Sequence, residues 1–74
     1  MKKDKFCREL GKLLAKTERF EDLICLEYDK GDDGEYVTPY WWDDASKRGY
    51  AGARIDVTAD SETAIIKDVL RAIE

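Results

Sequence analysis

Apolar residues recur at helical spacing at both ends of the chain, and apolar and polar residues alternate between those ends. Near the start, the apolar residues that share one helical face are Phe6, Cys7, Leu10, Leu13 and Leu14. The opposite face is basic, with Lys5, Arg8, Lys12 and Lys16. This pattern predicts a helix over about residues 4–17, with the Asp4 carboxylate capping its first turn.

A second helix is predicted at the end of the chain. Its buried stripe is formed by Ile65, Ile66, Val69, Leu70 and Ile73. We expect Asp60 to cap this helix, and Ser61 and Glu62 suit its first turn, where negative charge is favourable.

The segment 20–29 fits two structures. Ile24, Leu26 and Tyr28 alternate as in a strand, with Leu23, Cys25 and Glu27 on the other side. The apolar spacing from Phe20 to Tyr28 would also suit a helix. A strand is favoured because KGDDGE follows at 30–35, where glycine and aspartate are typical of a hairpin turn.

Two further strands are predicted. One begins at Glu35 or Tyr36 and contains Pro39, which cannot donate a ladder hydrogen bond, so we expect an edge strand or a bulge there. The polar, glycine-containing stretch 43–52 has the composition of a loop. The last strand should cover about residues 53–58, with Ala53, Ile55 and Val57 facing inward.

The predicted fold class is therefore α+β, in the order α-β-β-β-α. We expect a three-stranded antiparallel sheet with two helices packed on one face, because so few strands need a cover. The whole chain, 1–74, should form a single compact domain. Trp41 and Trp42 are adjacent and would leave a strand on opposite sides, so one should reach the core and the other the open side of the sheet or an edge.

Charge is sorted along the chain although its net value is only −4. Residues 1–19 hold most of the Lys and Arg, and residues 20–46 hold nine Asp and Glu against one Lys. The basic start leads into an amphipathic pattern and not into the apolar core of a signal peptide, so we expect a cytoplasmic protein. Two cysteines, Cys7 and Cys25, are expected to be free thiols in that compartment.

The composition offers little for catalysis or cofactor binding. The chain has no histidine, and its paired aspartates lie in polar stretches where both carboxylates should stay ionised. Asp29, Asp33 and Glu35 partly match a calcium loop, but two of its ligand positions hold Gly31 and Tyr40. We therefore predict a protein that is not an enzyme, with no metal and no cofactor.

Nucleic-acid binding through the basic face of the first helix is an alternative. Double-stranded RNA-binding domains share the order of elements, but they hold phosphate with lysines at the start of the last helix. Here that position holds Asp60, Ser61 and Glu62, which would repel phosphate. A structural or homodimerising domain of unknown role is a further alternative.

The favoured hypothesis is a small acidic protein-interaction module. Tryptophan and tyrosine are preferred anchors at interfaces, and an acidic rim would attract a partner protein with a basic surface. The candidate binding residues are Tyr36, Tyr40, Trp41, Trp42, Asp29, Asp32, Asp33, Glu35, Asp43 and Asp44. Such a protein could inhibit a nucleic-acid-handling partner, as small phage-encoded and anti-CRISPR inhibitors do, an analogy that rests on size and charge.

Overall fold

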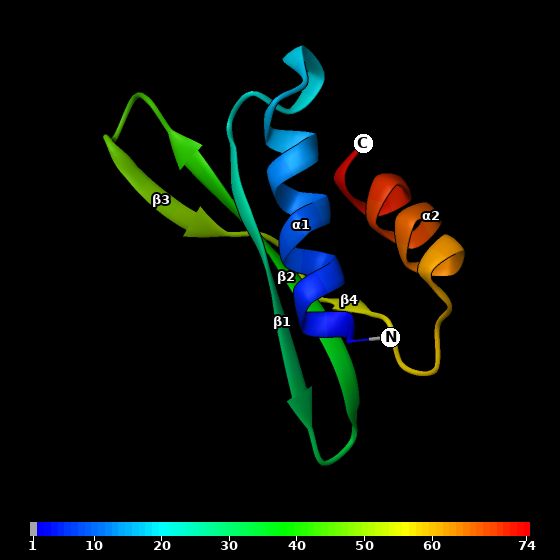
Figure 1. Ribbon diagram of the computed structural model, residues 1–74. Helices are drawn as coiled ribbons and strands as arrows, with labels where there is room; N and C mark the ends of the chain where they lie inside the picture. The colour runs from blue at the N-terminus through cyan, green and yellow to red at the C-terminus, as the bar shows by residue number, and fades with distance from the viewer. Residues whose placement is uncertain (1) are drawn as a thin grey trace.

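The fold is α+β, with two helices and an antiparallel sheet of four strands. The computed structural model describes residues 2–74. Its elements are α1 (Lys3–Ala15), the short 3₁₀ helix η1 (Glu18–Phe20), β1 (Leu23–Gly31), β2 (Gly34–Asp43), β3 (Arg48–Ala51), β4 (Ile55–Asp56) and α2 (Glu62–Ile73). Helix α1 lies across β1 and β2, and α2 lies beside α1 (Figure 1).

Strand β2 is the centre of the sheet. Along one edge it pairs with β1 over nearly its whole length. Along the other edge it pairs with β4 at Tyr36 and Val37, and with β3 from Tyr40 to Asp43. The prediction of three strands is therefore wrong in detail, because the third strand is divided in two and β3 forms inside the stretch 43–52 that was expected to be a loop.

Pro39 in β2 lies opposite the gap between β3 and β4 and explains why that edge is interrupted. Its carbonyl accepts a hydrogen bond of 2.7 Å from the Gly52 amide, so the Pro39 backbone faces the edge that carries β3 and β4. Proline has no N–H to donate back, and the regular ladder ends there. The expectation of an edge strand is thus wrong, and the register shift between β1 and β2 lies at Ile24 and not at Pro39. Ala53 lies in the resulting gap and is exposed rather than inward-facing.

A bulge in β1 corrects a second expectation. Leu23 pairs with Trp41 and Cys25 with Tyr40, which leaves Ile24 as an extra residue. An extra residue shifts the alternation of side chains by one position. Leu23 therefore joins the core together with Leu26, and Ile24 is 49% exposed.

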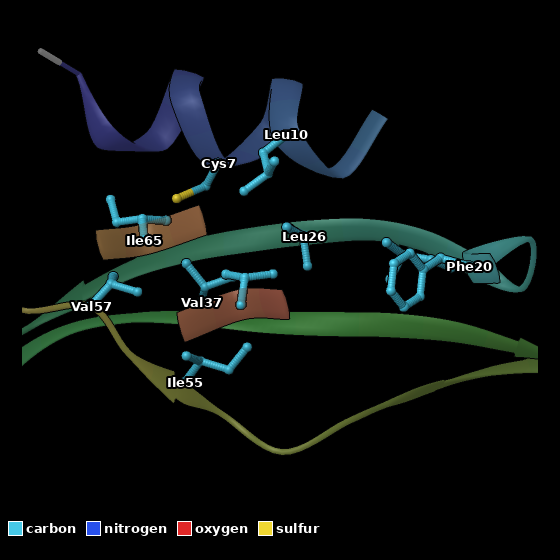
Figure 2. Packing of buried hydrophobic residues seen from close by; sticks show 10 residues of the cluster. Cys7, Leu10, Phe20, Leu26, Val37, Ile55, Val57 and Ile65 are labelled. Carbon is cyan, nitrogen blue, oxygen red and sulfur yellow. The ribbon is translucent and has the colours of Figure 1, made fainter. Parts of the chain in front are cut away.

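The helices and the sheet share one hydrophobic core. Its buried residues are Cys7, Leu10, Phe20, Leu23, Leu26, Val37, Ile55, Val57, Ile65 and Val69. Figure 2 shows Cys7 and Leu10 pointing from α1 towards the side where Leu26, Val37 and Ile65 lie. Helix α1 approaches the sheet closely at Gly11, where a Cβ atom would lie 2.7 Å from the Leu26 backbone nitrogen.

Both predicted helix caps differ from the structure. Helix α1 begins one residue earlier than expected, so Asp4 lies within its first turn and no side chain caps the helix. At α2 the cap is Ser61, whose side chain accepts a hydrogen bond from the Ala64 amide, and not Asp60. Asp60 instead lies near Asp68, and the neighbouring carboxyl group, together with partial burial, raises the pKa of Asp60.

A polar contact ties the start of α1 to the sheet. The Lys3 ammonium donates to Glu35 Oε1 at 2.8 Å and to the Val57 carbonyl at 3.0 Å. The Tyr28 hydroxyl donates to the other Glu35 oxygen. These two donors lower the pKa of Glu35 to about 2, and the same contact with Glu35 raises the pKa of Tyr28 to about 12.

Adding one methyl group at Gly11 should loosen the contact between α1 and β1. Alanine favours a helix over glycine by about 1 kcal/mol, but overpacking against backbone costs about 1–3 kcal/mol. Because the Leu26 nitrogen cannot move like a flexible side chain, we expect Gly11→Ala to lower the free energy of unfolding. Urea titration measures it, with the exposed neighbour Lys12→Ala as control. An unchanged or higher stability of Gly11→Ala would contradict the close approach.

The Glu35 contact should contribute stability that depends on pH. Its carboxylate is ionised in the folded protein down to about pH 2, whereas an unperturbed glutamate titrates near 4.5. The contribution should therefore be present above pH 4.5 and be lost as pH falls towards 2. In urea titrations the stability difference between wild type and Glu35→Gln should narrow over that range. The exposed Glu9→Gln control should show no such narrowing, and a constant difference for Glu35→Gln would refute the linkage.

Candidate functional site

The side of the sheet opposite α1 carries a row of aromatic residues on β2. Val37 is buried towards the helices, so the residues that alternate with it point the other way. These residues are Tyr36, Thr38, Tyr40 and Trp42, and none of them is buried. We call this side the open face. Three of the four aromatic residues predicted for binding thus share one face, along one strand.

At one end of the row, Tyr36 is covered by a cation. The Arg54 guanidinium lies 3.8 Å from the centre of the Tyr36 ring, which is close enough for a cation–π interaction. Tyr36 pairs with Asp29 on one side and with Asp56 on the other. Partial burial and the nearby Asp33 carboxylate raise the pKa of Tyr36.

At the other end, Trp42 is the most exposed aromatic side chain of the row, at 41%. Its backbone amide donates to the Asp22 carbonyl at 2.8 Å, which fixes β2 against the bulge in β1. Its partner in β3 is Gly49, where a Cβ atom would lie 3.2 Å from the Cδ1 atom of Ile24. Trp42 and Ile24 therefore flank Gly49 and form an exposed apolar end of the open face.

The open face is acidic around this row. Glu27 and Asp29 of β1 pair with Thr38 and Tyr36, and so point the same way as the aromatic side chains. Asp56 of β4 does so on the other edge, and hydrogen bonds from Thr58 lower the pKa of Asp56. All three carboxylates are exposed, against the single guanidinium of Arg54.

Several predicted binding residues lie away from the open face. Trp41 packs against the core, and Glu35 is held by Lys3 and Tyr28 on the helix side. Asp32 and Asp33 are exposed in the turn between β1 and β2, beside the Tyr36 end of the row. The expected division between the two tryptophans is confirmed: Trp41 faces the core and Trp42 faces outward.

The two acidic residues at the turn between β2 and β3 make contacts within that turn. Asp43 accepts hydrogen bonds from the Ala45 amide and the Ser46 hydroxyl. Asp44 pairs with Lys47 at 2.9 Å, and both side chains are largely exposed. These contacts order the turn, and a partner would have to compete with them.

The open face also carries residues that were not among the predicted binding residues: Ile24, Glu27, Arg54 and Asp56. The outward direction of Arg54 and Asp56 follows from the sequence, because both alternate with Ile55, which was expected to face inward. The place of Ile24 does not follow from the sequence, since only pairing with β2 reveals the bulge.

Other kinds of site find little support in the part of the chain that is described. Within residues 2–74, no three His, Cys, Asp or Glu side chains gather in a way that could hold a metal ion. Neither helix in that range is long and apolar enough to cross a membrane. Both cysteines are free thiols, and Cys7 is buried whereas Cys25 is partly exposed. Burial raises the pKa of each thiol, which makes neither a reactive nucleophile.

Truncating the two tryptophans should have unequal effects. Trp41→Ala removes a ring that packs against the core and should lower the free energy of unfolding by about 3 kcal/mol. Trp42→Ala removes a ring that is 41% exposed and lies outside the core, and should change the free energy of unfolding by less than about 1 kcal/mol. Thermal and urea melts of both variants test this. Equal and severe losses would mean that Trp42 is needed for folding and is not a free anchor.

Comparison with known proteins adds no assignment to this site. No protein-family model, no curated protein and no solved structure matches this chain. The function is therefore argued from the residues of the open face and their surroundings.

Proposed function

We propose that this protein is a non-enzymatic interaction module whose open face docks on a basic surface of a partner protein. The observation that carries the proposal is the row of Tyr36, Tyr40 and Trp42 along one face of a central strand. A rigid strand that pairs on both edges presents these rings at little entropic cost, which is the property of an interface anchor.

The surroundings of the row favour a cationic partner. Glu27, Asp29 and Asp56 border it, and the turn carrying Asp32 and Asp33 extends the negative charge beyond Tyr36. Carboxylates at a rim steer association with a positively charged surface and contribute less to the final affinity than the buried anchors do. Trp42 and Ile24 would supply the apolar anchor, since both side chains are exposed, by 41% and 49%.

A partner that handles nucleic acid is one class with the required surface. Channels and grooves for DNA or RNA are lined by lysine and arginine. An acidic domain of this size could occupy such a channel and inhibit the partner. The inhibitor role is the narrower part of the proposal, and the cytoplasm is the compartment where it would operate.

Direct nucleic-acid binding remains the competing function. A groove of 310 Å³ on α1 is lined by Lys2, Lys5, Arg8 and Lys12, but also by Asp4 and Glu9. The two carboxylates lie among the cations, and Arg8 approaches Asp4 to 4.0 Å. This mixture favours phosphate less than an uninterrupted basic stripe would.

A capture experiment followed by titration tests the proposal. Tagged wild-type protein and Trp42→Ala would be used as baits in an extract of the source cells, and a protein captured only by the wild type would be purified and titrated. We expect Trp42→Ala to weaken binding about 30-fold, the effect of losing an anchor worth about 2 kcal/mol. Leu13→Ala is the matched control, because Leu13 is 63% exposed on α1, away from the open face.

The salt dependence of that binding separates the two functions. Affinity for a basic protein should fall as salt rises, and charge reversal by Asp29→Lys should slow association. Equal binding by wild type and Trp42→Ala would refute the proposed role of the open face. Tight binding to duplex DNA or RNA, lost in Lys5→Ala, would favour the competing function.

A further inference from the structure

One edge of the sheet is left unpaired beside a groove. Within residues 2–74, β1 pairs only with β2, so its other edge has no neighbouring strand. A groove of 440 Å³ runs along this edge, lined by Cys25, Leu26, Glu27 and Tyr28 of β1 and by Asp4 and Arg8 of α1. Helix α1 overhangs the groove as one wall, and the edge of β1 forms the other.

The register of the sheet decides which backbone groups of β1 face the groove. The carbonyls of Glu35 and Pro39 accept hydrogen bonds from the β4 and β3 side, so these residues direct their backbone groups away from β1. Their partners Lys30 and Leu26, and Tyr28 between them, form the non-hydrogen-bonded pairs of the β1–β2 ladder. Their N–H and C=O groups therefore point outward, to the free edge.

The free edge of β1 is not equally accessible along its length. Near Leu26 helix α1 passes closely, since a Cβ atom on Gly11 would lie 2.7 Å from the Leu26 backbone nitrogen. The amides of Tyr28 and Lys30 lie further along β1, beyond that contact, where the strand runs past the end of the helix (Figure 1). An added strand could hydrogen-bond to these two residues and to the Leu26 carbonyl.

We propose that this edge binds an extended basic segment of a partner protein, which adds to the sheet as an antiparallel strand. Addition of a strand to an exposed sheet edge is a common mode of peptide recognition, in which backbone hydrogen bonds give affinity and alternate side chains give specificity. The proposal does not rest on the aromatic row, although both surfaces attract positive charge.

The carboxylates on the open-face side of β1 identify the occupant, because Lys30 pairs with Glu35 and points to the helix side. Glu27 and Asp29 point to the open face, are exposed and form no ion pair within the described residues. On an added strand, the side chains opposite them would be favoured if they were lysine or arginine. The intervening side chains would lie under α1, against Tyr28 and the aliphatic stem of Arg8, which favours apolar residues.

The same charges oppose pairing with a second copy of this chain. In an antiparallel β1–β1 pair with its two-fold axis at Glu27, the two copies of Glu27 would face each other. With the axis at Tyr28, Glu27 of each copy would face Asp29 of the other copy. Like charges directly opposite each other are destabilising in a sheet. A separate cationic segment is therefore the better partner for this edge.

Residue-resolved amide exchange with a synthetic peptide tests the proposal. The probe is an eight-residue peptide of alternating lysine and valine. In the free protein the amides of Tyr28 and Lys30 should exchange rapidly, and the peptide should slow both. The amides of Glu27 and Asp29 already bond to β2 and serve as internal controls, since they should be protected with or without peptide.

Matched peptides and variants separate strand addition from simple charge attraction. A peptide with methylated amides on its pairing side keeps its charge but cannot donate, and should bind about tenfold more weakly. Glu27→Lys should weaken the unmodified peptide about fivefold, whereas Glu21→Lys, the same change at an exposed site outside β1, should not. Trp42→Ala should leave peptide binding unchanged, so this test is independent of the aromatic row.

Three results would overturn the proposal. One is the absence of slowed exchange at Tyr28 and Lys30 in the presence of millimolar peptide. Another is equal affinity for the methylated and unmodified peptides, which would show charge attraction without pairing. The third is a dimer in sedimentation equilibrium whose Tyr28 amide is already protected without peptide, which would assign the edge to a second copy.

Discussion

Every other strand of the sheet depends on pairing with β2. Its alternation places Val37 and Trp41 against the core and Tyr36, Tyr40 and Trp42 on the opposite side. One strand thus supplies both the floor of the core and the aromatic row of the open face. A shift of one residue in its register would exchange the two sets, so the stability of the core and the position of the proposed binding surface are coupled.

Residues on the helix side of the sheet also hold α1 in position. Glu35 holds Lys3 at the start of the helix, and Leu26, paired with Pro39, lies under Gly11 in its middle. These two contacts hold α1 along β1, which is why the helix becomes one wall of the groove at the free edge. Glu35, which was predicted to belong to a binding rim, instead connects α1 to the sheet.

The two proposed surfaces meet along β1. Glu27 and Asp29 border the aromatic row on one side and the free edge on the other. A single basic partner could therefore place an extended segment along β1 and a folded surface against Trp42. The bulge at Ile24 adds apolar area next to Trp42, and as a distortion of β1 it also limits how far an added strand could extend.

The sequence by itself predicted the two helices, a strand within residues 20–29, a second strand from residue 35 or 36, and the opposite orientation of adjacent tryptophans. These follow from local spacing, because apolar periodicity of about 3.6 or 2 residues reflects which side of an element is buried. Only the tertiary structure decided which tryptophan packs against the core, that the edge beside β2 divides into β3 and β4 opposite Pro39, and that Glu35 bonds Lys3 and Tyr28. Each of these depends on partners distant in the chain: the register between strands sets the bulge and the gap, and no local pattern encodes a contact across 32 residues.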